Sequence, residues 1–180
     1  GETAFNAWLK ILPDSTVIVQ VPRQEMGQGI YTTLAMLVAE ELDADWSKVR
    51  VEQAQINPVY ANVTALGDSA PAPMQAAMIA TARVIGVQMT GGSTSTCDAW
   101  EPMRMAAASA RSMLLAAAAA KWNVPAGELS IDKSIVKHAG SGKVAPLGEF
   151  AQAAAALSPP SQVTVKLPKD WKILGTSPAR

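Results

Sequence analysis

The strongest constraint on the fold is a long run of helix-forming residues from Asp98 to Trp122, rich in alanine, methionine and leucine. These residue types have high helix propensities, so the run predicts the longest helix of the chain. Pro102 is compatible with this helix only near its start, because proline lacks the N–H that a helix interior needs. With 33 alanines among 180 residues, the chain offers small aliphatic surface that suits close helix packing.

A strand–loop–helix–strand unit precedes the long helix. Residues 15–22 are mostly β-branched and predict a strand. Residues 30–44 carry apolar side chains at three- and four-residue spacing, which predicts an amphipathic helix, and residues 48–55 predict a second strand packed on it. Elsewhere we expect a loop at 57–72, helices at 73–88 and 146–157, a strand or hairpin at 129–138, and an extended run at 162–166. The fold class is therefore α+β, a mixed sheet with packed helices.

Composition excludes several kinds of partner. Fifteen basic and fifteen acidic residues give zero net charge, which argues against nucleic acid and anionic membrane surfaces. One cysteine and one histidine leave no disulfide framework and no Cys-rich metal site within this chain. The longest apolar run, Met113 to Ala120, is far shorter than the roughly 20 residues that span a bilayer. Because the sequence begins at Gly1 rather than Met, we expect a processed or shortened chain.

Two loops that precede helices are the best candidates for ligand binding. In the first, Glu25 to Gly29, two glycines flank Gln28 and let the backbone approach a ligand at the start of the next helix. The second, Thr90 to Thr96, places five hydroxyls and two glycines before the long helix, a combination suited to a phosphate. A plain turn and an elaborate N-cap are the alternatives. Together the loops could hold the pyrophosphate and ring system of a large cofactor without any cationic residue.

Other reactive residue types point to structural roles. We expect Cys97 to be a small packed residue; the alternative is a reactive thiol activated by the helix N-terminus. We expect His138 to be a surface residue near a turn, and Glu149 a surface residue stabilised at the start of a helix by the helix dipole. The methionines of the long helix are expected in the core. A single histidine leaves no Ser/His/Asp constellation, and no general acid–base pair or catalytic residue is predicted.

The segment from Gln24 to Gly29, followed by a helix and then Lys48 to Val51, resembles the molybdenum-cofactor region of the xanthine dehydrogenase and aldehyde oxidase family. The order of segments is most similar to the large, molybdopterin-binding subunits of the isoquinoline 1-oxidoreductase and bacterial aldehyde dehydrogenase type. Further stretches keep the family's order at residues 37–46, 90–95, 100–104, 147–151 and 171–175.

The resemblance implies specific contacts with molybdopterin cytosine dinucleotide. The Met-Gly-Gln segment would touch the molybdopterin, and the hydroxyl loop would hold the phosphates. In this family the pterin's own dithiolene sulfurs hold the molybdenum, which requires no metal ligand from the chain. The residues carried over are Met26, Gly27 and Gln28 for the pterin, Thr90, Ser93 and Ser95 for the phosphates, and Gly92 and Thr94 beside them.

The resemblance also implies what lies outside this chain. Residues 1–166 would form the N-terminal portion of a molybdopterin-binding domain, and 167–180 a connector toward downstream domains. The family's proton-abstracting glutamate has no match here, since Gly148-Glu149 belongs to an early surface helix.

We therefore expect an inactive part of an enzyme that oxidises aldehydes or hydroxylates N-heterocycles. Its partners would be the remainder of the large subunit, a [2Fe-2S] small subunit and a cytochrome acceptor. The rival hypotheses are a stand-alone phosphate- or nucleotide-binding module and a structural domain that binds nothing.

Overall fold

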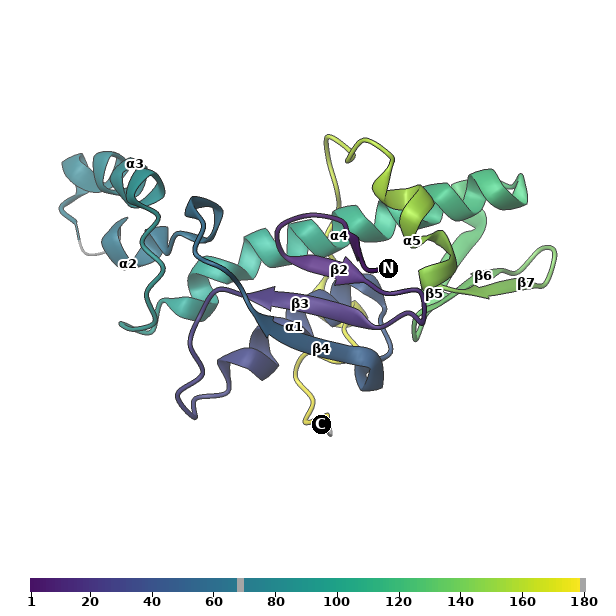
Figure 1. The fold of residues 1–180 in the computed structure, drawn as a ribbon, viewed down its shortest axis with the longest axis horizontal. Helices are drawn as coiled ribbons and strands as arrows, with labels where there is room; N and C mark the ends of the chain where they lie inside the picture. The colour runs from purple at the N-terminus through teal and green to yellow at the C-terminus, as the bar shows by residue number, and fades with distance from the viewer. Residues whose placement is uncertain (68–69, 179–180) are drawn as a thin grey trace.

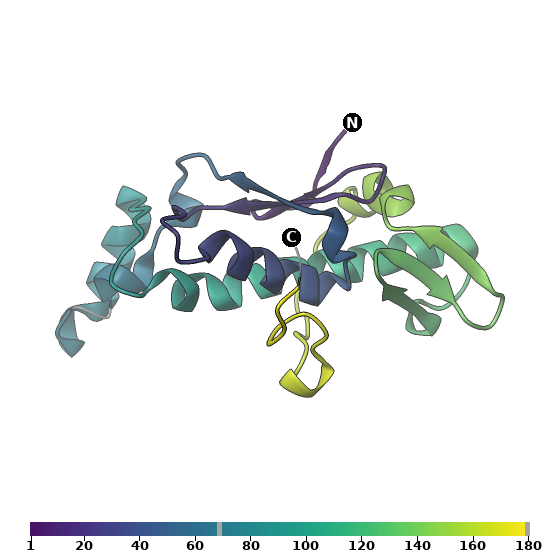
Figure 2. The ribbon, with the colours of Figure 1, turned by 90° about the horizontal axis from the view of Figure 1, so that it is seen from below.

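A four-stranded mixed sheet lies over two long helices (Figures 1 and 2). The computed structural model describes residues 1–67 and 70–178, so Asp68 and Ser69 of the expected 57–72 loop lie outside the described residues. The strands pair in the order β1 (Thr3–Ala4), β2 (Leu9–Ile11), β3 (Val17–Val21) and β4 (Val49–Gln53). Only β3 and β4 pair in parallel, with Val17 opposite Val49, and α1 (Ile30–Leu42) makes the crossover that a parallel pair requires.

The predicted strands at 15–22 and 48–55 and the helix at 30–44 are confirmed, as is the α+β class with its mixed sheet. The strands β1 and β2 were not expected from the sequence. They add the antiparallel half of the sheet and bring buried Leu9 and Ile11 into the core.

The long helix α4 (Ser95–Trp122) begins three residues earlier than predicted, so Pro102 lies in its third turn. It packs along α1, and the contact is formed by leucines of α1 and by small residues of α4. Ala107 and Ala110 are fully buried, and their short side chains let the two helices approach closely. Each buried leucine, such as Leu34 or Leu114, contributes about 1.5–3 kcal/mol of transfer free energy.

A second, antiparallel sheet covers the C-terminal half of α4. It consists of β5 (Leu129–Asp132), β6 (Ile135–His138) and β7 (Lys143–Pro146), followed by α5 (Gly148–Ala155), which also packs on α4. The predicted hairpin at 129–138 and the helix at 146–157 are confirmed, whereas β7 was not expected. The extended run at 162–166 joins no sheet, and its backbone carbonyls accept hydrogen bonds from arginines of α4.

The region between β4 and α4 forms a small helical unit at one end of the molecule (Figure 1). The loop expected at 57–72 contains the 3-10 turn η2 (Pro58–Tyr60) and the short helix α2 (Val63–Gly67), and the helix expected at 73–88 is α3 (Gln75–Ile85). Further 3-10 turns are η1 (Trp46–Lys48), η3 (Ala72–Met74), η4 (Ala126–Glu128) and η5 (Pro168–Asp170).

Two negative findings hold for the described parts of the chain. No helix there combines the length and the apolarity needed to cross a bilayer. No group of three or more His, Cys, Asp or Glu side chains there could hold a metal ion.

Candidate functional site

The two candidate loops meet where α1 and α4 begin, at the same end of the molecule (Figure 1). The backbone N–H of Gln24 donates to Thr90 Oγ1 over 2.8 Å and joins segments 66 residues apart in the chain. The Met26–Gln28 segment and the Thr90–Ser95 segment therefore lie beside each other, as the paired-loop hypothesis requires. The individual roles of these residues remain predictions.

The first loop is closed by the carboxylate of Glu25. This group accepts hydrogen bonds from the backbone N–H groups of Gly27 (2.8 Å), Gly29 (3.0 Å) and Tyr31 (3.1 Å). The φ angles of Gly27 and Gly29, +94° and +81°, lie in the left-handed region that glycine adopts most easily. The amides of Gly29 and then Tyr31 lower the pKa of the Glu25 carboxyl below its ordinary value. The amides expected to face a ligand at the start of α1 are thus bound by Glu25.

The side chain of Gln28 closes the same loop a second time. Its Oε1 accepts from the Met26 N–H over 2.6 Å, and its Nε2 donates to the Gln24 carbonyl over 2.9 Å. Met26 remains as an apolar side chain that is 68% exposed. The loop therefore has a fixed backbone and offers an apolar contact at its surface.

The second loop leaves the start of α4 open. Thr94, the N-cap residue, makes no side-chain capping bond, because its hydroxyl donates to the Gly91 carbonyl over 2.9 Å instead. The first amides of a helix have no acceptor within the helix, so an uncapped start is a set of donors for an anion. Gly92 and Ser93 adopt φ angles of +59° and +57°, Ser93 is exposed, and Ser95 is nearly buried as the first residue of α4.

Buried polar residues hold the two loops in place, and we did not predict them from the sequence. Arg23 directly precedes the first loop, and its Nη2 lies 2.5 Å from Oδ2 of Asp98 in the first turn of α4. Burial lowers the pKa of the Arg23 guanidinium, and the Asp98 carboxylate opposes this shift. Fully buried Asn62 donates through Nδ2 to Thr94 Oγ1 (2.8 Å) and to the Met89 carbonyl (3.1 Å). The sequence signal that could have indicated this pair was a charged residue next to each loop, Arg23 before the first and Asp98 after the second.

Two of the structural expectations for reactive residues are wrong. Cys97 is exposed rather than packed, because Ser95 and Ala99, four residues apart, turn the opposite face of α4 toward the interior. His138 is 5% exposed rather than a surface residue. Its Nδ1 lies 2.7 Å from Ser141 Oγ and its Nε2 lies 2.8 Å from Glu128 Oε2, so a Ser–His–acid chain exists that we did not predict. It fastens the β6–β7 turn to η4, far from the two loops (Figure 1).

The expectations for Glu149 and for two of the three methionines of α4 are confirmed. Glu149 lies in the first turn of α5 and pairs with Lys121 over 2.9 Å at the surface, as expected. Met103 and Met113 are in the core, whereas Met105 is 37% exposed.

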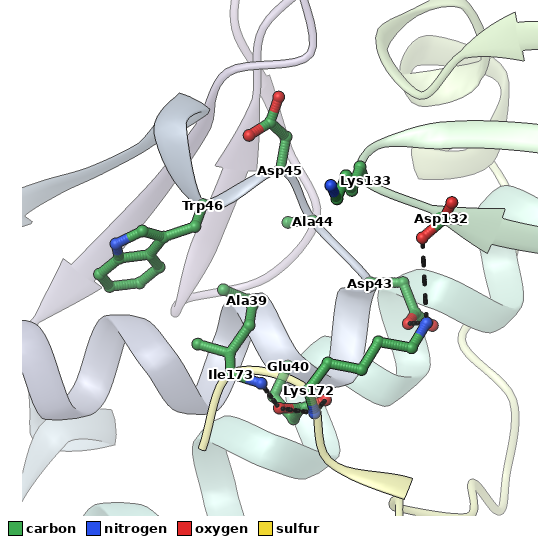
Figure 3. A pocket seen from close by; sticks show the side chains of 10 residues that line it. All are labelled: Ala39, Glu40, Asp43, Ala44, Asp45, Trp46, Asp132, Lys133, Lys172 and Ile173. Atoms are coloured by element: carbon green, nitrogen blue, oxygen red, sulfur yellow. Dashed lines mark hydrogen bonds and ion pairs between the residues drawn. The ribbon is translucent and has the colours of Figure 1, made fainter. Parts of the chain in front are cut away.

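A cavity of about 430 Å³ lies at the other end of α1, beside its last turn (Figure 3). Two carboxylates in its wall already have partners. The Glu40 carboxylate accepts from the backbone N–H groups of Lys172 and Ile173, and Asp43 pairs with Lys172 over 3.1 Å. The C-terminal end of α1 therefore binds the C-terminal segment of the chain through these contacts. Because α1 is 13 residues long, roughly 20 Å separate the cavity from the two loops.

Comparison with known proteins connects this geometry to one family. Residues 2–85 match the family model described as the molybdopterin cofactor-binding domain. The chain is 37% identical over 146 residues to the isoquinoline 1-oxidoreductase subunit beta of Brevundimonas diminuta, covering 81% of this chain and 16% of that protein. It is 30% identical over 142 residues to the membrane-bound aldehyde dehydrogenase [pyrroloquinoline-quinone] of Gluconacetobacter polyoxogenes, covering 78% and 15%.

A solved structure agrees in fold. Reconstituted CO dehydrogenase from Oligotropha carboxidovorans matches with a TM-score of 0.53 and 24% identity, covering 81% of this chain and 15% of that chain. The matched part of the chain thus covers about one sixth of the length of these relatives. On these matches, the chain belongs to the molybdenum hydroxylase family and carries part of its molybdopterin cofactor-binding domain.

Proposed function

We propose that this chain forms part of the cofactor site in the large subunit of a molybdenum hydroxylase and binds molybdopterin cytosine dinucleotide. The complete enzyme would oxidise an aldehyde or hydroxylate an N-heterocycle, with water as the source of oxygen. The observation that carries the proposal is the hydrogen bond from Gln24 to Thr90, which unites the two loops beside the uncapped start of α4.

The phosphates would bind at the start of α4. Its first amides and the hydroxyls of Thr90 and Ser93 supply donors, with Ser95 in the first turn and Gly92 and Thr94 shaping the loop. A helix N-terminus favours a nearby anion by about 0.3–1 kcal/mol, and by up to about 2 kcal/mol when partly buried. Neutral donors of this kind suit a chain with zero net charge.

The pterin would lie against the first loop. Exposed Met26 offers an apolar contact to a flat ring, and Gly27 and Gln28 offer backbone that Glu25 holds in place. The buried Nε of Arg23, beside this loop, has no hydrogen-bond partner among the described residues. One hydrogen-bond donor next to the loop is therefore unsatisfied within the described part of the chain. The residues present therefore fit an anionic cofactor with a ring system. When bound, the cofactor supplies two-electron redox chemistry at molybdenum held by its own sulfurs.

This chain's own residues would bind and orient the cofactor, and we expect the isolated chain to be inactive. Glu149, the glutamate that follows a glycine here, is paired with Lys121 on the surface and is no candidate for a catalytic base. One relative is named as a subunit of a larger enzyme. The proposed partners are accordingly the rest of the large subunit, a [2Fe-2S] small subunit and a cytochrome acceptor.

The test uses the full-length large subunit with Ser93→Ala and Ser95→Ala combined. Molybdenum per subunit is measured by mass spectrometry, and the cytosine nucleotide released by acid is measured by chromatography. Hydrogen bonds to charged groups contribute about 1.5–3 kcal/mol each, so both contents should fall by at least about tenfold. Ser130→Ala, at an exposed hydroxyl on β5, is the control and should change neither. Unchanged contents in the double variant would refute the phosphate role. Nucleotide without molybdenum in the unsubstituted protein would favour the stand-alone module.

A further inference from the structure

The segment that contains η2, α2 and α3 is unusually poor in charge. Among the 43 residues from Ala54 to Thr96, only Asp68 and Arg83 are charged, whereas 17% of the whole chain is charged. The surface of a soluble domain is usually about 25–35% charged. A segment with so few charges is typical of a surface that another protein surface covers.

The structure leaves much of this segment exposed. Ala82 is the only buried residue of α3. Val84 is 83% exposed, Ile85 66%, and Met74 and Val59 53% each, and we call these four residues the α3 surface. The other side of α3 is packed: a Cβ at Gly67 of α2 would lie 2.8 Å from the Ile79 side chain, and one at Gly86 would lie 3.3 Å from Pro58. Val84 and Ile85 therefore lie on a helix that is packed on one side and uncovered on the other, and Met74 and Val59 lie in the adjoining 3-10 turns η3 and η2 (Figures 1 and 2).

A cavity of about 430 Å³ lies at the base of this unit and extends the α3 surface. Such a hollow, with apolar walls and an adjoining apolar face, can receive apolar side chains from a partner, the arrangement that anchors many protein interfaces. Its apolar walls include Trp8, Pro58, Val59, Val63 and Pro102, and two charged residues, Arg83 and Asp98, also line it.

The α3 surface is also rigidly linked to the proposed phosphate loop. Asn62, directly before α2, donates from its backbone to the Val87 carbonyl (2.7 Å), which follows α3, and through its side chain to Met89 and Thr94. Met89, which is 41% exposed, directly precedes Thr90. A partner that covers the α3 surface would therefore also reach the edge of the cofactor site.

We propose that the α3 surface packs against an uncharged, apolar segment of the same large subunit, outside residues 1–180, and that this contact forms one wall of the cofactor site. The inference rests on the proposed function. The relatives are about five times as long as this chain, so most of the large subunit lies outside it. A segment tethered in the same polypeptide has an effective concentration in the millimolar range, which favours it over a second copy. The low charge argues against a strongly acidic or basic partner.

Photo-crosslinking in the full-length subunit tests the contact directly. We would replace Val84 by p-benzoylphenylalanine, irradiate the purified enzyme and map the linked peptides by mass spectrometry. The expected products join position 84 to peptides of the same subunit beyond residue 180. The same replacement at Val144, which is 65% exposed on β7, is the control and should give few such products. Links to residues 1–180 of another copy, links to the [2Fe-2S] subunit, or a yield no higher than the control would each overturn the proposal.

A charge substitution gives a second readout. Val84→Lys with Ile85→Lys should lower the melting midpoint of the full-length subunit by at least about 2 °C, whereas Val144→Lys should leave it unchanged. Equal midpoints for the two variants would count against the contact. The Ser93→Ala/Ser95→Ala experiment separates this inference from the proposed function. If that variant keeps its cofactor while position 84 still links to the same subunit, the phosphate role fails and the contact stands. If it loses the cofactor and position 84 does not link, the contact fails alone.

Discussion

Helices α1 and α4 begin side by side, each after a glycine-containing loop, but their N-termini are satisfied differently. At α1, the Glu25 carboxylate accepts from the amides of Gly27, Gly29 and Tyr31. At α4, Thr94 turns its hydroxyl to the preceding loop and leaves the first amides without a side-chain cap. A glycine loop before a helix is therefore not in itself an anion site, because a carboxylate from the chain can occupy the same donors.

The difference suits the two loops to two different parts of the proposed cofactor. The first loop, bound internally by Glu25 and Gln28, is a preformed surface suited to a flat, weakly charged ring. The second loop leaves the first amides of α4 without a side-chain acceptor, as the proposed phosphate site requires. The following substitutions perturb one loop at a time, or the link between them, in order of decreasing expected effect.

Asp98→Ala should have the largest effect, because it breaks the link between the loops. The side chains of Arg23 and Asp98 are 0% and 7% exposed, so the variant leaves a buried guanidinium unpaired. Removal of one partner of a buried ion pair costs about 3–5 kcal/mol, which urea unfolding would measure. Asp170→Ala, at an exposed carboxylate, is the control and should cost less than about 0.5 kcal/mol. A loss below about 1 kcal/mol for Asp98→Ala would show that the pair does not hold the loops.

Gly29→Ala tests the backbone of the first loop. At a φ of +81° an alanine is strained, and the left-handed conformation costs about 1–2 kcal/mol in the free energy of unfolding. A Cβ there would meet no atom within 4 Å, so the cost comes from the backbone alone. Gly127→Ala has equally open surroundings without a positive φ and serves as the matched control. Equal unfolding free energies for the two variants would contradict the assigned loop conformation.

The pH dependence of the Glu25 contacts should be the smallest effect. The amides of Gly29 and then Tyr31 lower the pKa of the Glu25 carboxyl below its ordinary value of 4.5. A carboxyl whose pKa is lower in the folded state stabilises the fold above its unfolded pKa, and this contribution is lost as the pH falls through the folded pKa. Between about pH 6 and pH 3, Glu25→Gln should therefore lose less stability than the unsubstituted chain. An equal loss would show that Glu25 does not cap α1.

Periodic patterns predicted the central elements well. The three- and four-residue spacing from Ile30 to Leu42 and the β-branched run before it were long enough to identify α1 and β3. β1 and β2, with two and three residues, are too short to carry a period. The sequence also indicated both loops, because clusters of glycine and hydroxyl residues before a helix are visible without any tertiary information.

The contacts that distinguish the loops could not be predicted in the same way. The Arg23–Asp98 pair joins residues 75 positions apart, and the burial of His138 requires η4 to approach the β6–β7 turn. Such contacts follow from tertiary packing, which no local pattern encodes. The Glu25 cap is local, but it depends on the positive φ angles of two glycines, and the sequence permits these angles without requiring them.

The most direct test of phosphate binding places a carboxylate in the loop directly before α4, as Glu25 is placed before α1. The carboxylate that α4 already carries in its first turn, Asp98, is paired with Arg23. Ser93→Asp would place a negative charge beside the start of α4, at a φ of +57° that aspartate and asparagine tolerate. Ser93→Asn, of nearly the same shape, is the uncharged control. In the full-length subunit we expect Ser93→Asp to reduce molybdenum and cytosine nucleotide per subunit by at least about tenfold, while Ser93→Asn retains both. Full cofactor content in Ser93→Asp would contradict phosphate binding at this helix.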